Sequence, residues 1–239
     1  MRNIWTICWR ELKAYFSSPI PYVVGAAFLA LVGYLFGSII ITSQEASLRS
    51  TFLNTVFLLV IAAPILTMRL LAEEQKLGTL ELLLTSPVHE WQIVIGKYLG
   101  SLIAFAGILV ALTLYYVLIL NLFGKPDFGS LATSYIGILL LGGSFLAIGL
   151  FTSSLTQNQI VAGFLGIVLL LFIWLADISI SALGLSGAIG DILNYLAIPR
   201  HFDNLFRGVL DTRDMVYALS WIAVPIFLAT QMLQSRRWR

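Results

Sequence analysis

The chain has 239 residues, of which 59% are hydrophobic and only 11% are charged, and its mean hydropathy is +0.93. Soluble domains carry about a quarter charged residues, so this composition excludes an ordinary water-soluble protein and leaves the lipid bilayer as the solvent. The length is that of one domain, which we place at residues 1–239. The single cysteine, Cys8, excludes an internal disulfide.

Residues 1–17 are predicted to form an amphipathic helix that lies in the membrane interface. Apolar side chains such as Trp5 and Phe16 share one face of this helix, and basic ones such as Arg10 and Lys13 share the opposite face. Because charges recur as far as Lys13, the segment does not fit a signal peptide. A plain topological anchor without any part in coupling is the alternative.

Six apolar stretches follow, each long enough to cross the hydrocarbon core, which takes about 20 residues of helix. Lipid cannot satisfy open backbone groups, so the spans must be helical. We therefore predict an all-α integral membrane fold with six transmembrane helices. The predicted spans are residues 20–42, 52–71, 98–123, 131–151, 159–176 and 215–233.

The distribution of basic residues predicts the orientation of this bundle. With six spans both termini lie on one side, and that side carries nine of the fourteen lysines and arginines. Basic residues near span ends stay in the cytoplasm, so both termini are expected there.

The loop 72–97 is the most informative polar segment. Gly78 interrupts any helix that continues from the second span, and Thr79 is a plausible N-cap for a new one. The apolar stripe consists of Leu77, Leu80, Leu83 and Leu84, and the flanking carboxylates are Glu73, Glu74 and Glu81. This short helix is either a lever docked in a groove of a cytosolic partner or an interfacial helix resting on lipid. The carboxylates favour the partner, because anionic lipid repels them.

The outer loop from Asp177 to Asp214 is too long for a plain turn. We predict two short re-entrant helices in it, Ile178–Ile189 and Ile192–Ile198, with Pro199 ending the second. Together they would cap the outer end of a pathway. The predicted outer-gate residues are His201, Phe202, Arg207 and Gly208. His201 has no second histidine or cysteine near it, so a metal site is not expected.

Polar side chains are rare within the spans. Asn54, Thr55 and Asn121 are the candidates for lining a mainly apolar cavity, since a lipid-facing asparagine is costly. A hydrogen bond between neighbouring helices is the alternative.

Two small-residue motifs favour close helix packing. They are Gly33-x-x-x-Gly37 in the first span and Ala162-x-x-x-Gly166 in the fifth. We interpret them as candidates for the seam of a two-fold dimer, and packing within one chain is the alternative.

The sequence lacks the patterns of an energy-converting or catalytic centre. No phosphate-binding loop is present, no ionisable group lies at mid-membrane, and no catalytic or metal-ligating constellation is found. We therefore expect no catalytic and no metal-binding residues, and any energy must come from another chain.

Three stretches of the sequence resemble a known family. They are Glu73-Glu74-x-x-x-Gly78-Thr79-Leu80-Glu81-x-Leu83-Leu84-Thr85-Ser86-Pro87, then Gly96-Lys97-Tyr98-Leu99, and Phe206-Arg207-Gly208-Val209-Leu210-Asp211-x-Arg213-Asp214-x-Val216-Tyr217. Together they resemble the membrane subunit of an ABC-2 type transporter, and within that family the gliding-motility-associated permeases. The resemblance extends over essentially the whole chain.

The resemblance implies a six-helix half-transporter in a bacterial plasma (inner) membrane, paired with a second copy and two cytosolic ABC ATPase subunits. ATP and Mg would be bound by the ATPase, and no cofactor by this chain. The loop after the second span would be the coupling helix, at about Thr79–Ser86. An auxiliary gliding-type membrane protein is a further partner in some relatives, and no nucleic-acid partner is expected.

These observations favour an exporter permease that couples ATP hydrolysis on a partner to movement of an amphipathic or lipid-like substrate. A membrane anchor or mechanotransmission subunit without solute transport is the alternative. An intramembrane enzyme is disfavoured, because no catalytic constellation lies at membrane depth.

Overall fold

The computed structural model describes residues 2–43, 47–85, 88–124, 126–183 and 198–237. All regular elements within these ranges are helices. The helices are α1 (Arg2–Ser17), α2 (Pro19–Ser43), α3 (Arg49–Thr67), α4 (Arg69–Lys76), α5 (Thr79–Thr85), α6 (Glu90–Phe123), α7 (Phe128–Leu155), α8 (Gln159–Leu183), α10 (Ile198–Phe206) and α11 (Thr212–Arg237).

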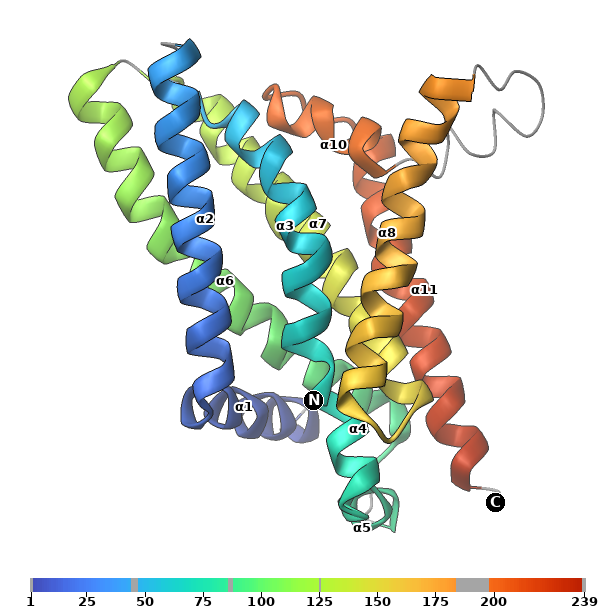
Figure 1. The fold of residues 1–239 in the computed structure, drawn as a ribbon. Coiled ribbons are helices and arrows are strands. Elements are labelled where there is room, and N and C mark those ends of the chain that lie inside the picture. Colours follow the sequence, from blue (N-terminus) through green and yellow to red (C-terminus); the bar gives the residue numbers. More distant parts are fainter. Residues whose placement is uncertain (1, 44–46, 86–87, 125, 184–197, 238–239) are drawn as a thin grey trace.

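The long helices form one bundle, and a shorter helix lies across part of it at each end (Figure 1). Helix α1 lies across one end, which also carries α5 and the two ends of the chain, and we call it the α1 end. Helix α10 lies at the opposite end, which we call the α10 end.

Among the described residues, five helices are long and apolar enough to cross a membrane. They are Pro19–Ser43, Arg49–Lys76, Glu90–Leu122, Phe128–Leu155 and Thr212–Ser235. The described apolar part of α8, Gln159–Leu175, is shorter. The all-helical, multi-pass architecture is thus confirmed, and the sixth span stays a prediction.

The outer loop differs from its prediction. Helix α8 continues past Asp177 to Leu183, so the helix does not end at Ala176, where the predicted fifth span ends. A single aspartate lowers the local hydropathy but costs an α-helix only a fraction of a kcal/mol, about 0.7 at most, so it does not end the helix. The predicted helix Ile178–Ile189 is therefore the end of α8 as far as Leu183, and its remainder lies outside the described residues.

The second predicted re-entrant helix, Ile192–Ile198, lies outside the described residues except for its last position. There α10 begins instead of ending, at Ile198, and Pro199 stands in its first turn. The prediction that Pro199 ends a helix was wrong. Proline has no N–H to donate, and the first turn of a helix is the place where none is needed.

Helix α7 is the most buried helix and contacts α3, α4, α6, α8, α10 and α11. Glycines on α7 allow this close approach: a Cβ at Gly142 would overlap the ring of Phe105, and one at Gly149 would overlap the hydroxyl of Thr67. On α8, a Cβ at Gly166 would lie 2.9 Å from Cβ of Pro64. Helix α3 is thus held at Pro64 between α7 and α8, and Ala162-x-x-x-Gly166 packs within the chain.

Helix α1 crosses the start of α6 at two glycines one turn apart. A Cβ at Gly96 would lie 2.8 Å from Cβ of Ile7, and one at Gly100 would lie 2.9 Å from Cβ of Glu11. The half of α1 that carries Ile7 and Glu11 is buried, whereas Trp5 stays exposed. The predicted amphipathic helix is therefore present. Part of its apolar surface packs against α6, and another part, which includes Trp5, is exposed.

Gly96→Ala is expected to push α1 off α6, because the added methyl meets backbone and Cβ atoms that cannot rotate away. Overpacking of this kind typically costs about 1–3 kcal/mol. Gly107→Ala, on the same helix, is the matched control, since nothing lies within 4 Å of its Cβ position. Melting of the purified protein in detergent, followed by tryptophan fluorescence, should show a lower midpoint for Gly96→Ala alone. Equal midpoints would contradict the close crossing.

Candidate functional site

The turn between α4 and α5 protrudes at the α1 end (Figure 1). Gly78 ends α4 with a φ of 70°, in the left-handed region that glycine adopts at little cost. Helix α5 then begins at Thr79, so Gly78 precedes its first turn and the N–H of Glu81 donates to the Gly78 carbonyl at 3.3 Å. The predicted interruption at Gly78 is confirmed, and Thr79 is the first helical residue of α5.

A cluster of four charged side chains holds α4 against α1 and α6. Nζ of Lys97 lies 3.0 Å from Oε2 of Glu11 and 2.9 Å from Oε1 of Glu74. Arg10 donates from Nη2 to the same Glu74 oxygen at 2.9 Å. Two cations thus face two carboxylates, and the cluster is neutral.

The position of Lys97 makes this cluster sensitive to loss of any member. Its side chain is only 1% exposed, whereas Arg10, at 53%, is largely in solvent. Removing one partner of a buried pair leaves an uncompensated charge away from water, which costs far more than losing an exposed pair. Lys97 therefore fixes the position of α4 relative to α1 and α6.

On its other side α4 is bonded to α7. The hydroxyl of Ser153 accepts hydrogen bonds from the backbone N–H groups of Leu71 and Ala72, both at 3.0 Å, and donates to the Met68 carbonyl at 2.8 Å. Nε2 of Gln75 donates to the Ser154 carbonyl at 3.1 Å. Because α4 is bonded to α1, α6 and α7 together, a force on α5 reaches three helices through one segment.

The predicted docking residues are divided between the interior and the surface. Leu80 is 4% exposed and belongs to the core, and Leu83 packs partly against it. Leu77 is 66% exposed, and Glu81 is exposed on α5. The turn at Gly78 brings α5 back against α4, which covers Leu80 and leaves Leu77 outside.

The other predicted residues of this segment lie as follows. Thr79 is exposed, and its hydroxyl donates to the Glu74 carbonyl at 3.4 Å. Glu73 is half-buried, and Glu74 belongs to the charge cluster. The side chain of Leu84 lies outside the described residues.

The predicted cavity residues do not gather within a single chain. Asn54 is exposed and donates to the Ser50 carbonyl of its own helix at 2.8 Å. Thr55 is buried and donates to the Thr51 carbonyl at 2.7 Å. Asn121 is exposed on α6. A role for Asn54 and Asn121 in lining a cavity would need a second subunit.

The predicted outer-gate residues lie together on α10 and the turn that follows it. Phe202 is buried. Nδ1 of His201 lies 2.9 Å from Oδ1 of Asp214, and its ring stacks on Tyr217 with centroids 4.0 Å apart. Gly208 turns the chain with a φ of 94°. These contacts place His201 in a link between α10 and α11.

Asp203 joins α10 to the start of α3. Its Oδ1 accepts from Nη2 of Arg49 at 2.9 Å, and its Oδ2 accepts from Nε of Arg207 at 2.8 Å. Burial alone would raise the pKa of the Asp203 carboxyl, but the hydrogen bonds and charges of the two arginines bring that pKa below its usual value. The carboxylate is therefore ionised at neutral pH and bridges two helices.

Sequence reasoning missed Lys97, Glu11, Arg10 and Ser153 as parts of this site. In the sequence Lys97 stood out only as a motif residue, and Glu11 did not stand out at all. A signal for the pair did exist, since a lysine next to an apolar span needs a partner carboxylate or water. Nothing in the spacing indicates which carboxylate that is.

Comparison with known proteins gives consistent results. A family model described as "ABC-2 family transporter protein" matches residues 5–238. Two curated relatives, from Escherichia coli strain K12 and from E. coli O157:H7, are both named "Probable multidrug ABC transporter permease YbhR". Each is 33% identical to this chain over 185 residues, which cover 71% of the chain and 46% of the relative. The match thus spans less than half the length of these relatives.

Lys97→Met is expected to destabilise the protein by about 3–5 kcal/mol, because Glu11 and Glu74 are left without their buried cation. Lys76→Met is the matched control, since Lys76 is an exposed cation on α4. Adding Glu11→Gln and Glu74→Gln to Lys97→Met should restore part of the loss, because no unpaired charge remains. Thermal melting in detergent measures all three variants. A Lys97→Met protein as stable as Lys76→Met would contradict the role of the cluster.

Asp203→Asn is expected to lower the melting midpoint at pH 7, and its difference from the wild type should shrink as the pH falls below about 4. A carboxyl whose pKa is lower in the folded chain stabilises the fold above its unfolded pKa of about 3.9, and this stabilisation is lost as the pH falls through the folded value. Glu81→Gln, at the opposite end, serves as the control. The measurement is the midpoint as a function of pH, and a difference that does not change with pH would refute the bridge.

Proposed function

Since the chain belongs to the ABC-2 family of transporter proteins, we propose that it is the membrane-spanning permease half of an exporter driven by a separate cytosolic ATPase. The observation that carries this proposal is the position of α5 and of the exposed Leu77, which directly follows α4. These residues protrude from a segment, α4, that is bonded to α1, α6 and α7. A partner that moves α5 thereby moves the bundle.

Two copies of the permease and two ATPase subunits make up the proposed complex in a bacterial inner membrane. The α1 end faces the cytoplasm, in keeping with the excess of basic residues on that side. ATP and Mg are bound by the ATPase subunits. Neither the matching family nor the curated relatives are described as gliding-associated. We therefore include no auxiliary gliding-type subunit in the proposed complex.

The contact surface for the ATPase consists of Leu77, Glu81 and the outward face of α5. Leu80 supports this surface from inside the chain, and Glu74 transmits its movement to Lys97. Glu73 and Glu81 are the carboxylates that would face basic residues of the ATPase. Docking thus combines one exposed apolar side chain with a negatively charged rim.

The proposed cargo is amphipathic or lipid-like. The spans carry few polar side chains, so an ion would find nothing to replace its hydration shell. The relatives named as multidrug permeases are in keeping with such a cargo. Asn54 and Asn121, both exposed in the single chain, are available to line a path between two copies.

Leu77→Ser is expected to weaken ATPase binding by about tenfold or more, because burying a leucine side chain contributes about 1.5–3 kcal/mol. The permease itself should stay folded, since Leu77 contributes little to its own core. Leu210→Ser is the matched control, a similarly exposed leucine at the α10 end. Copurification of the ATPase with each variant gives the readout.

Comparison with Leu80→Ser separates an effect on docking from an effect on folding. Leu80→Ser should lower both the melting midpoint of the permease and ATPase binding, whereas Leu77→Ser should lower ATPase binding alone. Stoichiometric ATPase on the Leu77→Ser permease would overturn the proposed surface. In proteoliposomes, an ATPase rate that responds to cargo supports export, and a rate indifferent to every amphipathic cargo tried favours an anchor or mechanotransmission subunit.

A further inference from the structure

A groove of about 440 Å³ opens at the junction of α1, α2 and α6. Tyr15 and Phe16 form its α1 wall, Tyr22 and Gly25 its α2 wall, and Ala104 and Gly107 its α6 wall. A Cβ at Gly107 would have no atom within 4 Å, so the hollow reaches the α6 backbone there. Its volume falls within the range of about 300–1,000 Å³ that small-molecule sites in proteins occupy.

The hydroxyl groups that line the groove already donate to backbone carbonyls. The Tyr15 hydroxyl donates to the Leu66 carbonyl at 2.7 Å, the Tyr22 hydroxyl to the Phe16 carbonyl at 3.0 Å, and the Ser101 hydroxyl to the Tyr98 carbonyl at 2.8 Å. Since these donors are used, the groove offers an occupant mainly apolar contact.

The length of the groove is close to that of one leaflet of the bilayer. On α6 the lining runs from Ser101 to Ala111, eleven residues and therefore ten helical steps, or about 15 Å, which is half of the roughly 30 Å hydrocarbon core. The groove therefore has the length of one leaflet, and its apolar lining suits an acyl chain.

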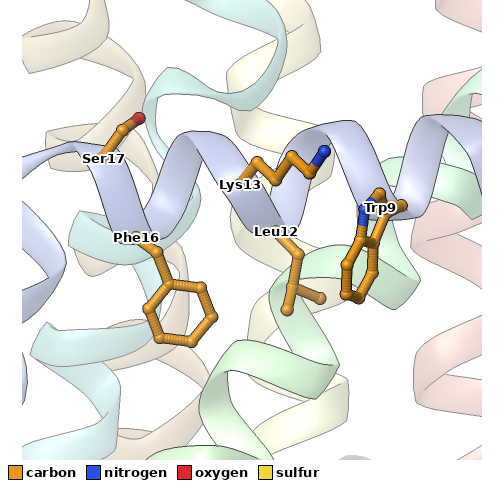
Figure 2. Close-up of a pocket in the computed structure, with 5 residues that line it drawn as sticks. All are labelled: Trp9, Leu12, Lys13, Phe16 and Ser17. Carbon is orange, nitrogen blue, oxygen red and sulfur yellow. The ribbon is translucent and has the colours of Figure 1, made fainter.

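Positive charge lies beside the α1 wall. Figure 2 shows Trp9, Leu12 and Phe16 pointing to one side of α1, with Lys13 alongside them. Nζ of Lys13 lies 5.9 Å from the ring centroid of Trp9 and forms no ion pair within the part of the chain that the structure describes. The guanidinium of Arg69 lies 4.8 Å from the Tyr15 ring. Lys13 thus lines a neighbouring hollow that shares Phe16 with the groove, and Arg69 lies against Tyr15 of the α1 wall.

We propose that this groove binds one acyl chain of an anionic phospholipid from the leaflet on the α1 side, with the lipid phosphate close to Lys13. Identification of the leaflet as the cytoplasmic one rests on the proposed function. Binding itself requires neither ATPase nor nucleotide, so it can fail while the exporter proposal stands, and the converse also holds.

The test uses the full chain in nanodiscs of phosphatidylglycerol and phosphatidylcholine, doped with either lipid carrying a photoactivatable group on its acyl chain. Mass spectrometry locates the label. Saturable labelling of α2 and α6 residues in the groove is expected, and Gly107→Leu should reduce it to background by filling the hollow. Gly37→Leu is the matched control, because Gly37 also has nothing within 4 Å of its Cβ position but does not line the groove. Lys13→Gln should reduce the preference for phosphatidylglycerol by about fivefold.

Labelling that rises linearly with probe concentration would show bulk-lipid contact only and would overturn the proposal. The same conclusion follows if Gly107→Leu, with an unchanged melting midpoint, is labelled like the wild type. A crosslink between two copies of the chain through groove residues would show a second copy at this face and would also refute the lipid site. If Gly107→Leu does not fold, competition of the label by unlabelled phosphatidylglycerol decides, and failure to compete counts against the site.

Discussion

A single buried ammonium group determines how the α1 end of this protein is assembled. Lys97 can stay out of water only because carboxylates from α1 and α4 converge on it. Charge pairing of this kind adds little net stability compared with apolar packing, but it strongly penalises any arrangement that separates the partners. We therefore expect α1, α4 and α6 to move as one unit. A segment that receives force from another protein requires such rigid coupling.

Helix α1 takes part in both functions proposed for the chain. One side of it supplies Glu11 and Arg10 to the charge cluster, and another supplies Tyr15 and Phe16 to the apolar groove. A lipid bound in the groove would contact α1, the same helix that is bonded to α4 through Arg10 and Glu74. The lipid composition of the membrane could thereby bias the response to ATP hydrolysis without any contact to the ATPase.

The sequence was sufficient to predict the class of fold, most of the helix positions and the interruption at Gly78, because hydropathy and backbone preference are local properties. It could not show that Leu80 turns inward while Leu77 faces outward, since both are leucines of one stripe and the turn decides between them. Nor could it pair Lys97 with Glu11 and Glu74, because these partners lie on other helices and the spacing does not show that they meet; Glu11 reaches Lys97 only through the crossing of α1 and α6 at Gly96 and Gly100. The separate helix predicted after Asp177 was wrong for a related reason. Hydropathy indicates where a membrane-spanning segment ends, and the helix itself can continue beyond that point.

The clamping of Pro64 between Gly149 and Gly166 has a mechanical consequence. Met68, which joins α3 to α4, has the helical angles φ −54° and ψ −31°, so the two helices form one continuous arm. Pro64 lies near its middle, with about 18 Å of helix toward Lys76 and about 22 Å toward Arg49. The same helix α7 also holds the α4 end of the arm through Ser153, so a displacement of α4 would have to carry α7 with it. At its other end the arm is bonded to α10 through Arg49 and Asp203, so one continuous helical segment connects the contacts at the two ends of the bundle.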